Sequence, residues 1–195
     1  WITTTDFLTN LGVSDIAINP TNPDEIFIIT GDRDAGDTYS YGLMKSNDGG
    51  LTFSEVTQGL PNQYITDIAF DPNKDETIIV TYGTYGNNNQ KVFISYNLGL
   101  SWQNITYNLG NMPIRCVVID HTDDSTIYLG AEIGIYKKTM NENSWELYNE
   151  NLPNTTVMEL EVVYGSNTLR ATTWGRGVWE YSLSGRKSHP SILTT

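Results

Sequence analysis

The stretch Ser46–Phe53 restricts the fold of this chain more than any other, because its pattern recurs further along. It reads Ser-Asn-Asp-Gly-Gly-Leu-Thr-Phe, and residues 95–102 and 139–145 repeat its order of polar turn residues followed by an aromatic residue. Asp and Asn side chains accept hydrogen bonds from nearby backbone amides, and glycine readily takes a positive φ. Short runs of aliphatic, aromatic and β-branched residues flank the stretch on both sides. Each copy therefore predicts a tight turn between two antiparallel strands.

Four apolar runs share a second pattern, at residues 13–20, 65–72, 114–121 and 157–164. Each leads through a polar turn into a second apolar run and then into a third. The first three units continue into the turn pattern and a short fourth run. Four short antiparallel strands that recur every ~40–50 residues are typical of the blades of a β-propeller. No stretch shows the sustained 3.6-residue apolar period of a helical solenoid.

The sequence therefore predicts an all-β fold, a β-propeller of four-stranded antiparallel blades, of which this chain forms the C-terminal part. The predicted units are a leading fourth strand of a preceding blade (1–12), three blades (13–61, 62–113 and 114–153), the first three strands of a last blade (154–184) and an exit linker (185–195). The alternative is a closed four-bladed ring in which the leading strand completes the last blade. We favour the larger propeller, because Trp1 falls inside a copy of the repeated pattern.

The net charge of the chain restricts the classes of partner that it can bind. The chain has 11 Lys and Arg against 23 Asp and Glu, a net charge of −12. Such an acidic surface argues against a nucleic-acid partner and against an anionic membrane. No apolar run approaches the roughly 18 residues of a membrane-spanning helix, so no direct membrane insertion is expected. The single cysteine, Cys116, lies in an apolar run and is predicted to be a buried, unreactive thiol.

Ser46–Phe53 also matches the Asp-box pattern S-x-D-x-G-x-T-W, with Phe in place of Trp. Over residues 1–184 the chain resembles the Asp-box (BNR-type) β-propeller family, which includes sortilin-like and xyloglucanase-like repeat proteins. Residues 171–180 look like the last blade of large proteins that Bacteroidetes secrete, often by the type IX route. In the family these turns lie on outer hairpins, away from the ligand-binding face. The resemblance therefore implies structural roles for its matching residues, which are Ser46, Asp48, Gly50, Thr52 and Phe53.

Ligand-binding residues are expected in the loops between the second and third strands of each blade. The loop at residues 31–41 combines carboxylates, an arginine and tyrosines that could bind a cation or stack on a sugar. Its acidic spacing lacks the Gly and the final Glu of an EF-hand, and a solvated acidic loop is the favoured alternative. Equivalent loops at residues 82–90 and 174–177 carry further aromatic and polar residues. The candidate binding residues are Asp32, Arg33, Asp34, Asp37, Tyr39, Tyr41, Tyr82, Tyr85, Trp174 and Arg176.

Three further acids share one position at the start of a first strand: Asp15, Asp67 and Glu159. Cys116 takes this position in the third blade. In a propeller, these side chains would point together toward the mouth of the central channel. They could hold a cation or act as catalytic carboxylates with raised pKa values. The alternative, which we favour, is that each accepts backbone hydrogen bonds at a strand start.

No catalytic set is complete in this sequence, and no catalytic residue, metal ligand set or cofactor is predicted. A sialidase-like reaction, which the family resemblance raises, would require an arginine triad, and the blades offer only Arg33, Arg115 and Arg170 before Trp174. We therefore expect a secreted or cell-surface module that binds or scaffolds glycan or protein ligands, with other blades of the same parent as partners. The alternative is a xyloglucanase-like glycoside hydrolase whose two carboxylates are shared with absent blades.

Overall fold

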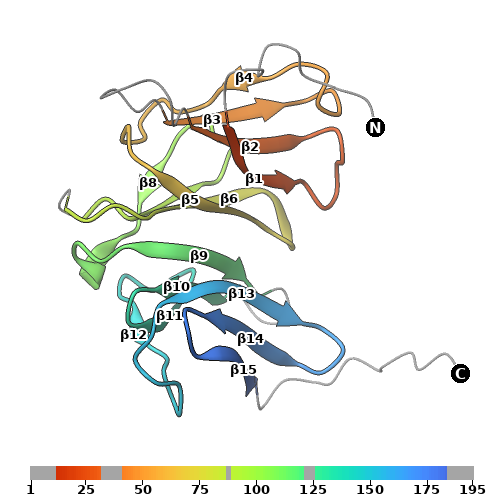
Figure 1. Ribbon diagram of the computed structural model, residues 1–195. Coiled ribbons are helices and arrows are strands. Elements are labelled where there is room, and N and C mark those ends of the chain that lie inside the picture. The colour runs from red at the N-terminus through yellow and green to blue at the C-terminus, as the bar shows by residue number, and fades with distance from the viewer. Residues whose placement is uncertain (1–11, 32–40, 87–88, 121–125, 184–195) are drawn as a thin grey trace, which may run out of the picture.

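The computed structural model describes residues 12–31, 41–86, 89–120 and 126–183. Within these ranges the chain forms four antiparallel sheets that lie side by side in one row (Figure 1). The first three sheets have four strands each, and the last has three. Residues 1–11 of the predicted leading strand (1–12) and the exit linker (185–195) lie outside the described residues, and Gly12 begins the first strand of the first sheet.

In every sheet the strands lie in chain order, so neighbouring strands are joined by hairpin connections. The first sheet contains β1 (Gly12–Ile18), β2 (Ile26–Gly31), β3 (Tyr41–Ser46) and β4 (Ser54–Glu55). The second contains β5 (Ile65–Asp71), β6 (Lys74–Tyr82), β7 (Val92–Ser95) and β8 (Gln103–Asn104). A short 3-10 helix, η2 (Tyr107–Leu109), leads to the third sheet, which contains β9 (Ile114–Ile119), β10 (Thr126–Ala131), β11 (Gly134–Thr139) and β12 (Glu146–Leu147). The last sheet contains β13 (Val157–Val163), β14 (Thr168–Thr173) and β15 (Gly177–Ser182).

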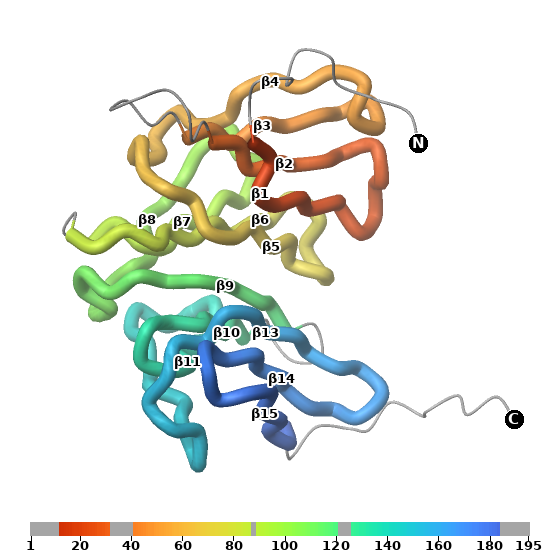
Figure 2. The backbone as a smooth tube through the Cα atoms, in the orientation of Figure 1, coloured from red at the N-terminus to blue at the C-terminus, as the bar shows by residue number. Residues whose placement is uncertain are grey.

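The first strands of the sheets lie next to one another. β1 contacts β5, β5 contacts β9, and β9 contacts β13, whereas β4, β8 and β12 form the outer edges of their sheets (Figure 2). Sheets that meet through their first strands and spread outward through their fourth are the blades of a propeller. The predicted all-β propeller fold is confirmed, with this chain forming part of one.

Strand register separates two faces of this row. At one end of the first sheet, Gly12 pairs with Gly31 and Gly31 with Tyr41. At the other end, Ile18 pairs with Ile26 and Ile26 with Ser46, where the turn pattern begins. We call the first end, with the starts of the first strands and the loops between second and third strands, the loop face. The opposite end is the turn face.

The described residues form three apolar core clusters, one between each pair of neighbouring sheets. Side chains alternate along each strand, so Val80 of β6 packs toward the first sheet and Ile79 toward the third. Both faces of the middle sheets are buried, which explains the nearly continuous apolar runs of β6 and β10. Complete burial of one such side chain stabilises the fold by roughly 1.5–3 kcal/mol.

The turn pattern forms a compact hydrogen-bond network on the turn face. The Ser46 hydroxyl donates to Asp48 Oδ1 (2.7 Å) and accepts from the Gly50 amide (2.9 Å). Asp48 in turn accepts from the Thr52 amide (2.9 Å) and the Thr52 hydroxyl (2.6 Å). These bonds lower the pKa of Asp48 from 3.8 to about 2. Gly50 has φ 89°, a conformation that other residues rarely adopt.

The second copy of the turn repeats this network, and the third replaces it. Asn97 accepts from the Ser101 amide (2.9 Å), and the Gly99 amide donates to Ser95 Oγ (2.8 Å). In the third turn, the buried Lys138 amine donates to the carbonyl oxygens of Thr139 (2.8 Å) and Glu142 (3.1 Å). A lysine amine has three donors, so it can satisfy the carbonyls of a turn that lacks the Ser and Asp.

Cys116 is buried, as predicted, and burial raises the pKa of its thiol. Within the described ranges, no helix combines the length and the hydropathy needed to cross a membrane.

Candidate functional site

A polar pocket of about 240 Å³ opens on the loop face where the first strands converge. Every first strand contributes to it: β1, β5, β9 and β13 each supply one or two side chains. We call it the inner pocket, and its lining residues are Ser14, Asp15, Tyr64, Thr66, Asp67, Arg115, Met158 and Glu159. The three acids predicted from their shared strand position thus line one pocket. A role for them in binding or chemistry stays a prediction.

A β-bulge directs these acids. The register of the first strand shifts between Val13 and Asp15, between Ile65 and Asp67, and between Val157 and Glu159. A bulge leaves the residue before each acid unpaired, and it changes the direction of the side chains around it relative to the regular alternation. The next backbone amide is then available to the acid itself, as in Ile16 N to Asp15 Oδ1 (2.8 Å).

Two of the acids also join neighbouring sheets. Asp15 Oδ2 accepts a hydrogen bond from the Ile68 amide of the second sheet (3.2 Å). Asp67 Oδ2 accepts from the Val117 amide of the third sheet (2.7 Å), and its Oδ1 accepts from the Ile68 amide (2.8 Å). The backbone hydrogen bonds that we favoured from the sequence are therefore present at Asp15 and Asp67.

The pKa values of the pocket acids move upward. Burial raises the pKa of Asp67 from 3.8 to about 8, and the adjacent Asp15 carboxyl adds to the shift. Burial and the charge of Asp15 also raise the pKa of Glu159. Two carboxyl groups in one pocket cannot both ionise freely, so Asp67 keeps its proton near neutral pH. The pocket thus holds at least one carboxyl group whose protonated form is favoured near neutral pH.

Arg115 extends this site toward the neighbouring loops. Its Nε donates to Glu132 Oε1 (3.1 Å), and a second guanidinium nitrogen contacts the same oxygen. The Tyr85 hydroxyl also hydrogen-bonds to Glu132, which raises the pKa of Tyr85, while the bonds from Arg115 and Tyr85 lower that of Glu132. Neither Arg115 nor Glu132 was among the site residues predicted from the sequence. Arg115 directly precedes Cys116, which takes the strand position of the three acids in the third sheet. This neighbouring position was the sequence signal for Arg115.

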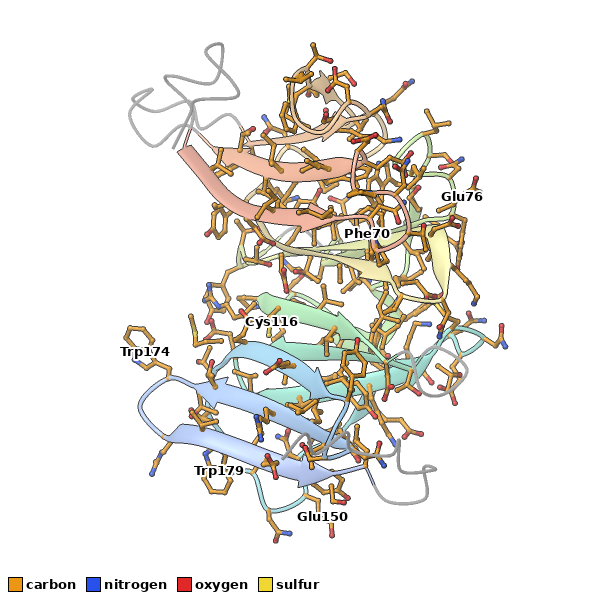
Figure 3. All side chains as sticks on the ribbon, turned by 90° about the vertical axis from the view of Figure 1, so that its right-hand side faces the viewer. Phe70, Glu76, Cys116, Glu150, Trp174 and Trp179 are labelled. Carbon is orange, nitrogen blue, oxygen red and sulfur yellow. The ribbon has the colours of Figure 1, made fainter. Side chains whose placement is uncertain are left out.

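Two aromatic side chains stand exposed on the loop face. Tyr85 is 74% exposed and Trp174 is 75% exposed, although large aromatic rings are usually covered. Trp174 projects from the turn between β14 and β15 (Figure 3), and its amide donates to Thr156 O (2.8 Å). Rings held out in this way can stack on the apolar face of a sugar.

The remaining candidates have varied positions. The prediction for Tyr82 is wrong: it is fully buried and packs edge-on against Phe93 (5.6 Å), because it completes the apolar run of β6. Tyr41 is half-buried and packs edge-on against Tyr64 of the inner pocket (5.6 Å). Arg176 is exposed, and its carbonyl accepts from Trp179 Nε1 (2.9 Å). The other loop candidates, Asp32, Arg33, Asp34, Asp37 and Tyr39, lie outside the described residues.

In the part of the chain that the structure describes, no group of three or more His, Cys, Asp or Glu side chains is arranged to hold a metal ion.

The sheets, their radial order and the pocket where they meet define part of a β-propeller with a polar site on its loop face. No model of a known protein family matches the chain. It is similar to a Neosartorya fischeri protein named probable oligoxyloglucan-reducing end-specific xyloglucanase, with 27% identity over 168 residues. The match covers 75% of this chain and 19% of that protein, so the chain spans about a fifth of its relative.

Solved structures show the same fold. A GH74 enzyme of Niastella koreensis superposes with a TM-score of 0.69 at 21% identity, over 88% of this chain and 29% of that one. PorZ of Porphyromonas gingivalis, a bacterial surface component of the type-IX secretion system, superposes with a TM-score of 0.54 at 15% identity. That superposition covers 90% of this chain and 34% of PorZ.

Proposed function

We propose that this chain is part of a secreted or cell-surface β-propeller of the Asp-box type that binds a glycan on its loop face. The observation that carries the proposal is the inner pocket, in which four strands place carboxyl groups, a guanidinium and hydroxyls together. The exposed Tyr85 and Trp174 rings on the same face complete the set.

The chemistry of the pocket suits a ligand rich in hydroxyl groups. A sugar hydroxyl both donates and accepts, so it needs donors and acceptors side by side. Glu159 offers acceptor oxygens, Arg115 offers donors, and the hydroxyls of Ser14, Tyr64 and Thr66 can do both. The name of the fungal relative, an enzyme of xyloglucan chains, supports a glycan over a protein as the ligand class.

The exposed aromatic residues supply the second element of glycan recognition. Stacking of a sugar ring on Tyr85 or Trp174 would bury apolar area while leaving the hydroxyls at the ring edge free for polar partners. Sites of this kind combine apolar surface with a few placed polar groups.

A binding assay tests the proposal. Isothermal titration of the chain with xyloglucan oligosaccharides, and with mannan- and cellulose-derived oligosaccharides, should detect binding of at least one class. Trp174→Ala and Glu159→Gln should each weaken it by about tenfold or more. Tyr96→Ala and Tyr164→Ala are matched controls, because both tyrosines are 52% exposed but lie toward the turn face. Equal losses in the controls, or no binding by any class, would overturn the proposal.

A hydrolase that shares its site with further blades is the second candidate, and Asp67 is the observation in its favour. Glycosidases of the common type need one protonated carboxyl and a second carboxylate across the scissile bond. Burial raises the pKa of Asp67 to about 8, which favours the protonated form that an acid catalyst needs. Release of reducing ends from xyloglucan by the full parent protein, lost in Asp67→Asn while binding persists, would establish this candidate over binding alone.

A further inference from the structure

The exposed ring of Tyr85 stands on a short piece of backbone that a buried lysine holds from inside the molecule. Tyr85 lies in the connection between β6 and β7, and Lys91 directly precedes β7. The Lys91 amine donates to Thr84 O, and to Gly86 O at 2.7 Å. These two carbonyls belong to the residues directly before and after Tyr85. The Lys91 side chain is fully buried, so it fixes the backbone beneath a ring that is itself exposed.

A second buried side chain holds the same backbone from the segment that leads into β5. The Thr84 hydroxyl donates to Oε1 of Gln63 (2.7 Å), and Gln63 is buried. Next to it, the Gly83 amide donates to Tyr64 O (3.2 Å). A Cβ atom on Gly83 would clash with the Thr66 side chain, so the backbone here packs closely. Because Tyr64 and Thr66 line the inner pocket, the piece that carries Tyr85 is fixed to the wall of that pocket.

The surroundings of Lys91 are unfavourable for a charge. Among the described residues, Lys91 forms no ion pair with a carboxylate. Burial lowers the pKa of Lys91, because the charged form loses its contact with water. An apolar side chain of the same length would avoid this penalty. What the lysine adds in its place is the pair of hydrogen bonds to the carbonyls on either side of Tyr85.

Lys138 is a second buried lysine, and its surroundings differ. It also donates to turn carbonyls, but its amine lies over the rings of Tyr107 (5.7 Å) and Trp145 (5.5 Å). The charge of Glu142 partly opposes the effect of burial on its pKa. The charge of Lys138 is therefore stabilised by aromatic rings and a carboxylate as well as by carbonyls. This makes Lys138 a useful comparison for Lys91.

The position of Tyr85 affects the inner pocket through its hydroxyl. That hydroxyl hydrogen-bonds to Glu132, which also accepts from Nε of Arg115 (3.1 Å). Arg115 lines the inner pocket. A displaced Tyr85 would therefore remove a ring from the loop face and a hydrogen bond from the partner of Arg115. A ring that is already held in place loses less conformational entropy when a ligand stacks on it.

We propose that Lys91 and Gln63 are positioning residues for ligand binding. They hold the Tyr85 ring out on the loop face and its hydroxyl against Glu132, so that the ring and the inner pocket act as one site. Neither residue contacts the ligand. The proposal rests on the proposed function for its ligand, a glycan, but the placement of Tyr85 is a property of the free protein and is measured without a ligand.

Fluorine NMR of the chain labelled with 3-fluorotyrosine tests the placement. The Tyr85 signal, assigned by its loss in Tyr85→Phe, should shift in Lys91→Met toward the position of tyrosine in the unfolded chain. Methionine matches the length of lysine but donates no hydrogen bond. Lys138→Met is the matched control, a buried lysine at turn carbonyls on the turn face, and should leave the Tyr85 signal in place. A Tyr85 signal that does not move in Lys91→Met would overturn the proposal.

Gln63→Leu is a second test, which decides the case if Lys91→Met does not fold. Leucine keeps apolar bulk at this position but removes the acceptor for the Thr84 hydroxyl. The Tyr85 signal should shift in the same direction as in Lys91→Met, by a smaller amount, because the bonds from Lys91 remain. Thermal melting identifies the variants that fold. An unshifted Tyr85 signal in folded Gln63→Leu would contradict the role of this second support.

A double-mutant cycle connects the placement of Tyr85 to binding. With a glycan that binds the wild-type chain, Lys91→Met should weaken binding by about threefold to tenfold, the effect of releasing one held side chain. It should weaken binding no further in a Tyr85→Ala background, because Lys91 acts through the ring. Lys138→Met should leave the affinity unchanged. Equal losses from Lys91→Met in both backgrounds would show that Lys91 does not act through Tyr85.

The two measurements keep the two proposals apart. If no glycan binds the wild-type chain, the proposed function fails, whereas the fluorine signal still decides whether Lys91 and Gln63 position Tyr85. If a glycan binds and the Tyr85 signal ignores both variants, the proposed function stands and the positioning role is wrong.

Discussion

Asp48 and Asp67 are the same residue type in two regions of the molecule, and their pKa values move in opposite directions. Asp48 lies in the turn on the turn face, where hydrogen bonds from Thr52 and Ser46 lower its pKa to about 2. Asp67 lies in the inner pocket, where burial and the nearby Asp15 raise its pKa to about 8. In the turn, hydrogen-bond donors stabilise the charged carboxylate of Asp48, whereas burial in the inner pocket favours the protonated form of Asp67.

This difference separates carboxyl groups that stabilise the fold from carboxyl groups that could act on a ligand. A network whose donors all satisfy one carboxylate stabilises the chain locally and leaves no group free for a ligand. Carboxyl groups with raised pKa values are typical of sites that bind or transfer protons, although structural networks can raise them too. We therefore expect substitutions at the turns to change stability most, and substitutions in the inner pocket to change pH dependence and ligand binding.

The largest effect is expected for Trp145→Ala. Trp145 is buried in the cluster between the second and third sheets, and its indole bonds to Ile105 O. Loss of a buried tryptophan removes apolar contacts and leaves a cavity, so the free energy of unfolding should fall by about 3–5 kcal/mol. Urea denaturation measures it. Met158→Ala, in the lining of the inner pocket, is the control and should cost less than about 1 kcal/mol. Similar losses of unfolding free energy in the two variants would contradict the distinction between structural residues and the inner pocket.

A smaller loss of unfolding free energy is expected for Ser46→Ala. The Ser46 hydroxyl is buried and accepts from the amides of Asp48 (3.2 Å) and Gly50 (2.9 Å). Without it these donors lose their partner, which costs about 1–3 kcal/mol. Ser54→Ala, on the exposed β4, should change the free energy of unfolding by less than about 0.5 kcal/mol. Asp48→Asn should be milder than Asp48→Ala in the same urea assay. In the second turn Asn97 Oδ1 still accepts from the Ser101 amide, and its Nδ2 donates to the Ser101 hydroxyl, so the direction of one bond is reversed.

The turns could be predicted from sequence because their bonds are local. Ser46, Asp48 and Thr52 lie within a span of seven residues, so a motif of eight residues contains the whole network. The shared position of Asp15, Asp67 and Glu159 was readable for a related reason, since a repeat places equal residues at equal strand positions.

The rest of the site was not readable, because it depends on contacts between sheets and on strand irregularities. Glu132 bonds to Arg115 within one hairpin of the third sheet and to Tyr85 from a loop of the second sheet. No short sequence motif contains these residues. The β-bulges that aim the acids leave no mark in the apolar pattern. Tyr82 looked like a loop residue because Gly83 follows it, whereas β6 continues through it and buries its ring.

The pH dependence of stability separates the two aspartates. The pKa of Asp67 is raised in the folded state, so its contribution is full below about pH 4 and is lost as the pH rises toward 8. The pKa of Asp48 is lowered, so its contribution is full above about pH 4 and is lost as the pH falls toward 2. Urea unfolding between pH 2 and 9 should show that Asp67→Asn flattens the upper window and Asp48→Asn the lower one. An upper slope that persists in Asp67→Asn would assign it to other groups.

The smallest effect on stability is expected for Glu159→Gln. Much of the Glu159 surface is exposed. Partial desolvation of its carboxyl and the charge of Asp15 raise its pKa, so its charged form gains little from the fold. The free energy of unfolding at pH 7 should therefore change by less than about 0.5 kcal/mol. Gln keeps the shape of Glu but replaces one acceptor oxygen with a donor, which a ligand hydroxyl would meet directly. Glycan titration should then weaken while urea unfolding stays constant, whereas Glu161→Gln on the same strand should leave both unchanged. A large loss of stability in Glu159→Gln would show that this acid, like Asp15 and Asp67, holds sheets together.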